Sequence, residues 1–504
     1  MPRIHSSWIK MVRSSRSKNQ KPKVSCIPSE LLQFVQRDTY SLLIKGDAGT
    51  GKTTLSLSIL RALNIKSNFF YISTRISTKQ LFTYYPWLHE LIEKPKMSPA
   101  AGETPHKGYT LSSFEDARLD EPESLFERIT NQLMDVKAPI IIIDSWDAIA
   151  SFMDKEARLN NERVLQTWCE RAGAKLILIS EYPTNKTLDF LVDGIVELQY
   201  KFHDDLKIRE ILLSKLRGIE IKKPSYIYSL NDGIFRSYSS YSLSDFDISS
   251  NFACIHKEAQ ALEPLLSKDS YITSGYEALD TDLGGGFPSK GIVLIDTDPS
   301  INVKITTAFL AVIISKFGRS CNPVIIQPSS IFDANFIECY MNTLVRIDAM
   351  KKGLVQILYP IKEMEEQGET SLDVTDYGYL NKFQQQFELF RNVIAKTRQE
   401  HPDKVLLNVL GMETPTSGKI NKTNEIKILD IISFVRSNSD LCLLLTTNSQ
   451  DMDDHITRIS DIYLKLKTIN GTLCLHSVRP PLRLYALTTI TSIEYPKVKL
   501  EPLV

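Results

Sequence analysis

The sequence has no long apolar run, no closely paired cysteines and no excess of charge of one sign. Its purely apolar segments are short, such as residues 140–143, far below the ~18 residues that a membrane-spanning helix needs. The seven cysteines and eight histidines are scattered, without the paired spacing of metal ligands. These absences argue against a transmembrane helix, a disulfide framework and a transition-metal site, and we expect free thiols in a reducing cytoplasm.

The charge that is present is unevenly placed. Residues 1–24 carry seven Lys or Arg and no acid, so the rest of this chain of zero net charge is mildly acidic. An acidic body is a poor electrostatic match for a nucleic-acid backbone, although the basic segment could contact RNA, DNA or an acidic partner. A solvated, disordered leader, or a start placed too far upstream of Met11, is the favoured interpretation. No apolar segment follows the basic one, so it does not read as a secretory signal.

The order of predicted elements indicates an α/β protein with two domains. A chain of 504 residues, 42% hydrophobic and 24% charged, is expected to form two or more soluble globular domains. Short apolar strands alternate with helical stretches, as in a parallel sheet covered on both faces. This order stops in a Ser- and Tyr-rich segment and then restarts as a second copy. The predicted parts are a basic leader (1–24), a first domain (25–235), a linker (236–270), a second domain (271–485) and a C-terminal tail (486–504).

The segment GDAGTGKT, from Gly46 to Thr53, fits the phosphate-binding pattern G-x-x-x-x-G-K-[ST] in full. Its glycines let successive N–H groups turn inward, and the helix that follows presents its positive end to the phosphates. Lys52 is expected to bind the β and γ oxygens, and the Thr53 hydroxyl to ligate Mg²⁺. The predicted nucleotide contacts in this loop are Gly46, Asp47, Ala48, Gly49, Thr50, Gly51, Lys52, Thr53 and Thr54.

Asp144 follows the buried-strand pattern APIIII and is predicted to hold the Mg²⁺ shell through water. An isolated Asp after a strand is more often a turn former. Its place downstream of Lys52, in a parallel sheet, favours the metal interpretation. Thr53 and Asp144 are therefore the predicted magnesium residues, and ATP and Mg²⁺ the predicted cofactors.

These segments, in this order, resemble the KaiC/RadA branch of the RecA-like ATPases: the P-loop, IDSWDA, LILISE, VDGIVEL and SKLRG. In the second half, YITSGYEALDTDLGGGFPSKGIVLID is similar to the leading segment of a KaiC domain. More narrowly, LLIKGDAGTGKTTL, YISTRISTKQLFTYYPWL and FEDARLDEP resemble the archaeal GvpD-type proteins, most sharply over residues 27–235. The resemblance implies two tandem RecA-like (P-loop NTPase) domains. Because GvpD-type proteins are regulators in gas-vesicle systems, it also implies regulation through a protein partner such as a transcriptional regulator.

The sequence departs from this family at the catalytic carboxylate. KaiC and RadA domains carry glutamate just after the second strand, where this chain has Thr74 and Arg75. Neither is a base at neutral pH, so the sequence predicts slow ATP hydrolysis. Asp147 or Glu181 could replace the missing base. Arg75 could stabilise charge on the γ-phosphate, or be a surface arginine at a strand end.

Lys215 and Arg217 lie two residues apart in SKLRG, a spacing that puts both on one face of a strand. In KaiC-like hexamers this pair reaches the nucleotide of the neighbouring subunit. The resemblance therefore implies self-association that depends on nucleotide. The alternative is a pair of solvated charges near a sheet edge.

The second half has lost its phosphate cradle. Its loop, DTDPSINVKIT, keeps Lys304 but has no glycines, and Asp296 and Asp298 put negative charge where phosphates would lie. Asn408 stands at the expected place of the metal-binding acid. The second domain is predicted to bind no nucleotide and to serve as a scaffold or a partner surface.

Three functions are compatible with these patterns. The first is a regulatory, ATP-dependent switch acting on a protein partner. The second is a RadA-like, DNA-dependent ATPase of recombination or repair, which the missing carboxylate and the lack of a basic DNA-facing loop disfavour. The third is a structural protein with a vestigial P-loop, which the intact Lys52, Thr53 and Asp144 disfavour. The sequence does not distinguish ATP from GTP.

Overall fold

The computed structural model describes most of the chain, and its contacts divide it into two compact units. The described residues are 26–91, 112–118, 120–133, 136–182, 187–246, 271–327, 337, 354–358, 376–411, 422–447, 454–479, 482–491 and 496–503. The first unit comprises Met1–Leu198, Leu212–Pro224 and Asp232–Ser237; the second comprises Gln199–Ile211, Ser225–Asn231 and Tyr238–Val504.

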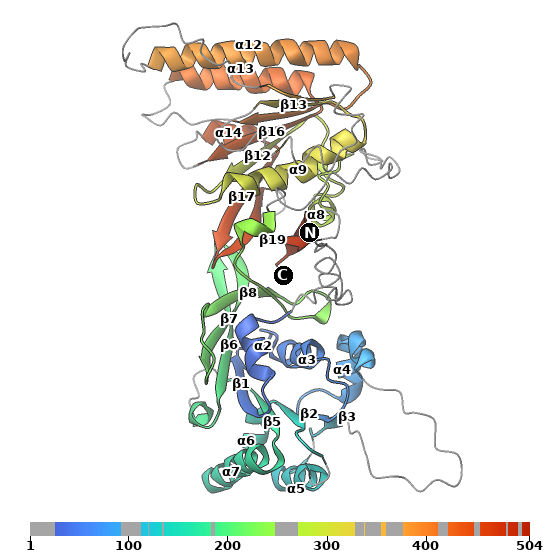
Figure 1. The fold of residues 1–504 in the computed structure, drawn as a ribbon, viewed down its shortest axis with the longest axis vertical. Helices are drawn as coiled ribbons and strands as arrows, with labels where there is room; N and C mark the ends of the chain where they lie inside the picture. Colours follow the sequence, from blue (N-terminus) through green and yellow to red (C-terminus); the bar gives the residue numbers. More distant parts are fainter. Residues whose placement is uncertain are drawn as a thin grey trace, which may run out of the picture. The chain divides into compact units, whose positions relative to one another are not determined.

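The first large sheet, as far as the structure describes it, has nine strands in the order β3-β2-β4-β5-β1-β6-β7-β8-β9 (Figure 1). Strands β3, β2, β4, β5, β1 and β6 pair in parallel. All residues of β1 and β2 are buried, as expected where helices cover both faces of a parallel sheet. The strands are β1 (Tyr40–Gly46), β2 (Phe69–Ser73), β3 (Ser112–Asp116), β4 (Ile140–Asp144), β5 (Lys175–Ser180), β6 (Gly194–His203), β7 (Leu206–Leu216), β8 (Ser225–Ser229) and β9 (Arg236–Tyr238).

The helices of the first half begin and end at residues suited to those places. Ser77 and Gln80 form a capping box at the start of α4, and Asp154 caps α7, which ends at the left-handed Gly173. Helices α5 and α7 contact each other, and Phe126 of α5 stacks on Trp168 of α7. The helices are α2 (Ser29–Val35), α3 (Lys52–Ala62), α4 (Thr78–Tyr84), η1 (Pro86–Glu90), α5 (Pro122–Leu133), α6 (Trp146–Ala150), α7 (Lys155–Ala172), η2 (Thr187–Phe190) and η3 (Asn231–Gly233). The short helix η4 (Leu243–Phe246) that follows belongs to the second unit.

The second large sheet has the same arrangement of strands as the first sheet. Its described strands follow the order β14-β13-β15-β16-β12-β17-β18-β19-β20, so that β12 takes the place of β1 and β17 that of β6. The pairs from β14 to β17 are parallel, and those from β17 to β20 are antiparallel. The strands are β12 (Gly291–Thr297), β13 (Val324–Gln327), β14 (Val355–Ile357), β15 (Leu407–Gly411), β16 (Leu441–Thr447), β17 (Ile462–Ile469), β18 (Thr472–Arg479), β19 (Arg483–Thr491) and β20 (Pro496–Pro502).

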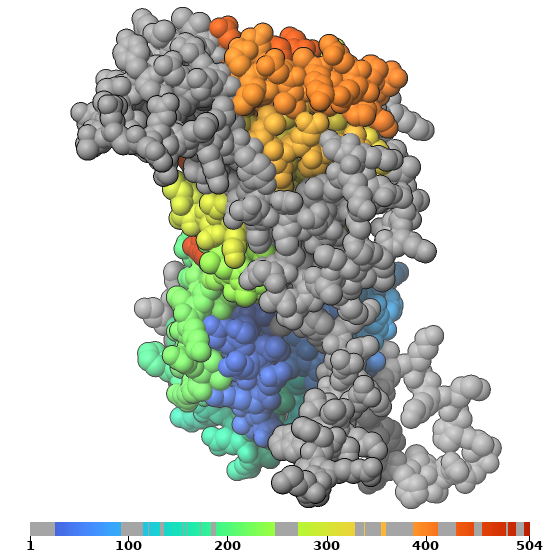
Figure 2. Space-filling view, turned by 45° about the horizontal axis from the view of Figure 1, so that its top comes forward, coloured from blue at the N-terminus to red at the C-terminus, as the bar shows by residue number. Residues whose placement is uncertain are grey.

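Helices cover both faces of this second sheet. Helices α12 and α13 lie side by side on one face and α9 packs on the other (Figure 1). The orange residues in Figure 2, which include described residues of α12, form an outer surface of the unit. The elements are α8 (Glu277–Asp282), α9 (Val303–Arg319), α12 (Asp376–Glu400), α13 (Lys422–Asn438), α14 (Asp454–Ile459) and the two-stranded ribbon β10 (Tyr271–Ile272) and β11 (Phe287–Pro288).

The predicted fold class is confirmed: two α/β halves, each with a large, mostly parallel sheet, follow one another along the chain. The predicted leader lies outside the described residues, as does most of the predicted linker, whose first residues contain β9 and η4. The predicted tail contains most of β19 and all of β20. There Val498 and Leu500 are buried on either side of the exposed Lys499, the alternation of a half-buried strand. No helix in the described part of the chain is long and apolar enough to cross a bilayer.

A candidate nucleotide site at the end of the first sheet

The loop between β1 and α3 has a backbone that requires glycine. Gly46, Gly49 and Gly51 have φ angles of 154°, 79° and 93°, values that residues with a Cβ rarely adopt. At Gly46 a Cβ would also lie 2.4 Å from the carbonyl oxygen of Leu198 on β6. Among the described residues, no side chain caps the start of α3. The loop therefore ends at a helix N-terminus of the kind that binds anions.

Lys52 lies inside this loop. Its ammonium donates hydrogen bonds to the carbonyl oxygens of Gly46 at 2.7 Å and Asp47 at 2.8 Å, and the residue is only 7% exposed. Burial lowers the pKa of Lys52, while the nearby carboxylates of Glu181, Asp144 and Asp47 act in the opposite direction. Two neutral carbonyl oxygens thus hold the Lys52 ammonium at the loop. Phosphate oxygens, which are negatively charged, would make stronger hydrogen bonds to the same ammonium.

Thr53 and Asp144 meet at the base of the loop. The Thr53 hydroxyl donates to Oδ2 of Asp144 at 2.6 Å. Burial raises the pKa of Asp144, and its hydrogen bonds from Thr53 and Tyr71 oppose that rise. A hydroxyl and a carboxylate are the hard oxygen groups that Mg²⁺ prefers. The two side chains that the sequence pairs as magnesium residues therefore lie together and have fitting chemistry.

Tyr71 is a member of this site that the sequence patterns do not reveal. Its hydroxyl donates to Oδ2 of Asp144 at 2.5 Å. Strands β2 and β4 are neighbours, with Ser73 opposite Asp144, and Tyr71 lies two residues earlier on the same face of β2. Only the pairing of these two strands, which are far apart in sequence, brings the phenol to the carboxylate.

Thr74, at the place of the missing base, and Asp147, one of its two proposed substitutes, both bind backbone groups. The Thr74 hydroxyl donates to the carbonyl oxygen of Asp144 at 3.0 Å and accepts from the amide of Ser145 at 2.8 Å. The carboxylate of Asp147, which is 8% exposed, accepts a hydrogen bond of 2.6 Å from the amide of Glu181. Both side chains therefore help to shape the ends of β4 and β5.

Arg75 and Glu181 form an ion pair, with 2.5 Å between Nη2 and Oε2. The arginine side chain is 54% exposed and the glutamate side chain 23%. Both influence the pKa of Lys52, in opposite directions. The two residues that the sequence proposes for catalysis are thus next to each other and near the P-loop lysine. Among the described contacts the Glu181 carboxylate binds the Arg75 side chain, whereas that of Asp147 binds a backbone amide.

Lys215 and Arg217 both bind the segment that runs from η2 to the start of β6. The Lys215 ammonium donates to the carbonyl oxygens of Asp189 at 3.0 Å and Val192 at 2.7 Å. Arg217 donates to the carboxylate of Asp193 at 2.9 Å, and its side chain is 67% exposed. Within one chain the pair therefore supports this connection, and the structure does not bring either residue to the P-loop of its own chain.

The corresponding loop of the second half is occupied by its own side chains. Strand β12 and helix α9 are separated by five residues, as are β1 and α3. Asp298 accepts a hydrogen bond from the amide of Ser300 at 2.8 Å, and Asn302 accepts one from the amide of Lys304 at 2.9 Å, capping α9. Amides that would cradle a phosphate are here satisfied internally.

Two residue assignments made from the sequence of the second half need correction. The equal loop lengths put Val303 in the place of Lys52, so Lys304 lies one position later, in the place of Thr53. The strand registers put Gly411 in the place of Asp144, because Leu410 and Ile143 have equivalent partners on β16 and β5. Asn408 is buried three residues earlier, where its amide donates to Ser439. The corrected positions also lack both the lysine and the acid.

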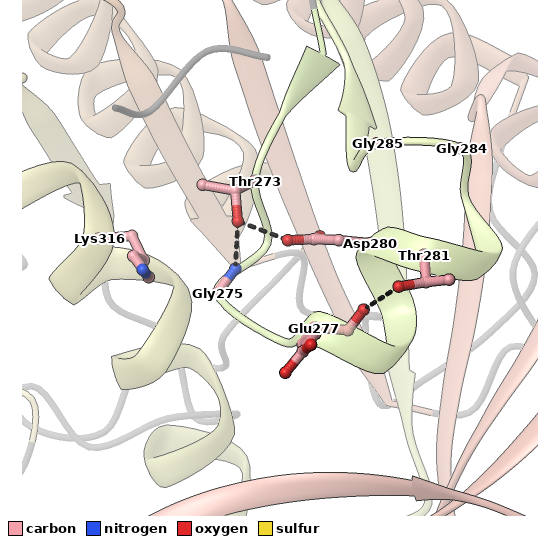
Figure 3. Close-up of a pocket in the computed structure, with 8 residues that line it drawn as sticks. All are labelled: Thr273, Gly275, Glu277, Asp280, Thr281, Gly284, Gly285 and Lys316. Carbon is pink, nitrogen blue, oxygen red and sulfur yellow. Dashed lines mark hydrogen bonds between the residues drawn. The ribbon is translucent and has the colours of Figure 1, made fainter. Parts of the chain in front are cut away.

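A separate cavity of about 600 Å³ lies between the segment that leads into β12 and helix α9 (Figure 3). Its polar groups bind one another: Asp280 accepts from Thr273, Thr273 accepts from the amide of Gly275, and Thr281 donates to the carbonyl of Glu277. These groups shape a turn and do not converge on a bound molecule. The cavity is therefore a weaker candidate than the P-loop.

Replacing Gly46 with alanine is expected to lower the free energy of unfolding by about 2 kcal/mol, because a Cβ there adds backbone strain and meets the carbonyl of Leu198. Urea denaturation measures this change. Gly284→Ala is a matched control, since Gly284 also has a positive φ but a Cβ there would meet nothing within 4 Å. An equal effect of the two substitutions would show that the contact with Leu198 is unimportant.

The chain matches known proteins over the residues that build this site. Residues 31–214 match the family model described as the GvpD gas vesicle protein, P-loop domain. Protein GvpD2 of Halobacterium salinarum (strain ATCC 700922 / JCM 11081 / NRC-1) is 21% identical over 502 residues, covering 95% of this chain and 97% of that protein. Protein GvpD1 of the same strain is 22% identical over 544 residues, covering 95% and 96%. The resemblance to GvpD-type P-loop proteins is therefore confirmed.

Proposed function

We propose that this GvpD-type P-loop protein binds ATP with Mg²⁺ in its first half and acts as a slow, nucleotide-dependent switch on a protein partner. One observation carries the proposal. The first half has a glycine loop at an uncapped helix start, with Lys52 inside it and the Thr53–Asp144 pair at its base. The equivalent loop of the second half is closed by Asp298 and Asn302.

The same site supports slow hydrolysis. Thr74 takes the place of the usual glutamate, and its hydroxyl is hydrogen-bonded to backbone. We assign the role of orienting the attacking water to Glu181, which is paired with Arg75. A bound γ-phosphate would compete with Glu181 for the guanidinium, since both are anions. Binding of ATP would then release the carboxylate and place Arg75 on the phosphate.

The proposed partner is a protein, such as a transcriptional regulator. The family model that matches residues 31–214 is that of a gas vesicle protein, and a nucleotide switch needs a second molecule that distinguishes its two states. A second copy of the chain is part of the same proposal. Arg217, exposed over two thirds of its side chain, is the better placed of the two basic residues to reach a neighbouring nucleotide, because Lys215 is held by two carbonyls.

Calorimetric titration of the purified protein with ATP and Mg²⁺ is expected to show saturable binding of one nucleotide per chain. Single-turnover hydrolysis should be slow and insensitive to added DNA. GTP titrated in parallel shows which base is preferred. Two bound nucleotides per chain would contradict the assignment of the second half, and strong stimulation by DNA would favour a motor enzyme.

Light scattering with and without nucleotide reports self-association, and capture from native extract with ATP or ADP reports the partner.

A further inference from the structure

Tyr71 and Thr53 share one oxygen of the Asp144 carboxylate. Oδ2 accepts from the Tyr71 hydroxyl at 2.5 Å and from the Thr53 hydroxyl at 2.6 Å. Tyr71 is fully buried in the middle of β2, and its ring lies 5.5 Å from that of Phe114, centroid to centroid. The phenol ring fills the core between strands, and its hydroxyl reaches the site.

The hydroxyl is costly to bury unless it is hydrogen-bonded, and its partners are the Asp144 carboxylate and the Ser56 side chain. A buried polar group without a partner destabilises a protein by about 1–3 kcal/mol, and phenylalanine would supply the same ring without that penalty. The Tyr71 hydroxyl donates to the Asp144 carboxylate at 2.5 Å, and an ionised carboxylate can only accept hydrogen bonds.

We propose that Tyr71 is a positioning residue for the magnesium ion of the nucleotide complex. It holds the Asp144 carboxylate with Oδ2 against Thr53, so that both oxygen groups are already in place when Mg²⁺ arrives with ATP. Tyr71 acts through Asp144 and is not itself a ligand. The inference rests on the ATP·Mg²⁺ site proposed above, and it concerns the metal-dependent part of the binding energy alone.

Tyr85 provides a matched control. Its hydroxyl lies 2.9 Å from Oγ1 of Thr54, on the first turn of α3. It is thus a second tyrosine that is hydrogen-bonded at the phosphate-binding helix, but its bond does not go to the metal-binding pair. A general effect of removing a tyrosine hydroxyl near the loop would appear in both variants, whereas an effect on the metal would appear only at Tyr71.

The test compares ATP binding with Mg²⁺ and in excess EDTA for the wild type, Tyr71→Phe and Tyr85→Phe. For Tyr71→Phe, the gain in affinity caused by Mg²⁺ is expected to fall about tenfold, the size of one hydrogen bond to a charged group. Affinity in EDTA should stay at the wild-type value. Tyr85→Phe should keep the full Mg²⁺ gain. Thermal melting of the nucleotide-free proteins shows whether each variant is folded.

A full Mg²⁺ gain in Tyr71→Phe would overturn the inference. An equal loss of affinity with Mg²⁺ and with EDTA would also overturn it, because that result indicates a general role in shaping the pocket. Failure of the proposed function gives a different result: the wild type would then bind no nucleotide under either condition, and both proposals would fall together.

Discussion

Lys52→Ala is expected to weaken binding of ATP with Mg²⁺ by at least about a hundredfold, since charge-assisted hydrogen bonds contribute about 1.5–3 kcal/mol each and the ammonium would face two phosphate groups in the proposed complex. The fold should be little affected. In the nucleotide-free protein Lys52 binds only carbonyl oxygens of its own loop among the described contacts, and its burial already disfavours the charged form. Calorimetric titration measures the affinity, and thermal melting confirms the fold.

The second half supplies the control for this experiment. Lys304 is the second residue of α9, as Thr53 is the second residue of α3. By residue type alone, Lys304 would be chosen as the counterpart of Lys52. Lys304→Ala is expected to bind ATP as the wild type does, because its loop is closed by Asn302 and Asp298. The reverse pattern, with binding lost in Lys304→Ala and kept in Lys52→Ala, would place the nucleotide in the second half.

Glu181→Gln is expected to slow ATP hydrolysis further, by less than the about 10²- to 10⁴-fold that a well-placed general base contributes, with little change in ATP affinity. The amide keeps the size of the side chain but cannot accept a proton. It also loses the ion pair with Arg75, which is exposed enough to contribute at most about 1 kcal/mol to stability. Single-turnover measurement with radiolabelled ATP gives the rate, and titration gives the affinity.

Asp147→Asn separates this role from a structural one. The asparagine keeps an oxygen that can accept from the amide of Glu181, as Asp147 does, so hydrolysis should change much less than in Glu181→Gln. If the two variants lost activity equally, the loss would be due to the conformation of the end of β5, and Glu181 would not be the base. If neither lost activity, the water would be oriented by another group.

The conformation of the candidate nucleotide loop and the place of Asp144 were predictable because local sequence determines them. Gly46, Gly51, Lys52 and Thr53 are close neighbours in one loop, and their roles follow from the conformation that those residue types permit. Asp144 was predictable because a short run of buried β-branched residues ends there. In both cases the information lies within about ten residues, which a pattern can capture.

The rest of the site depends on contacts between distant segments. Tyr71 meets Asp144 only because β2 pairs with β4, and the ion pair of Arg75 with Glu181 joins the ends of β2 and β5. Strand order in a parallel sheet is set by tertiary packing and crossover helices, which no short pattern encodes. Residue type alone can also lead to a wrong alignment. Loop length shows that Val303, and not Lys304, corresponds to Lys52. Strand register shows that Gly411, and not Asn408, corresponds to Asp144.

Strand β6 links the phosphate loop to the second unit through unbroken backbone. Leu198 on β6 lies opposite Gly46 in the parallel ladder, and its carbonyl closes the space beside that glycine. From the next residue, Gln199, the same strand belongs to the second unit. The space beside Gly46 is therefore bounded by a hydrogen-bonded strand and not by a loop, which restricts the conformations open to the start of the candidate phosphate loop.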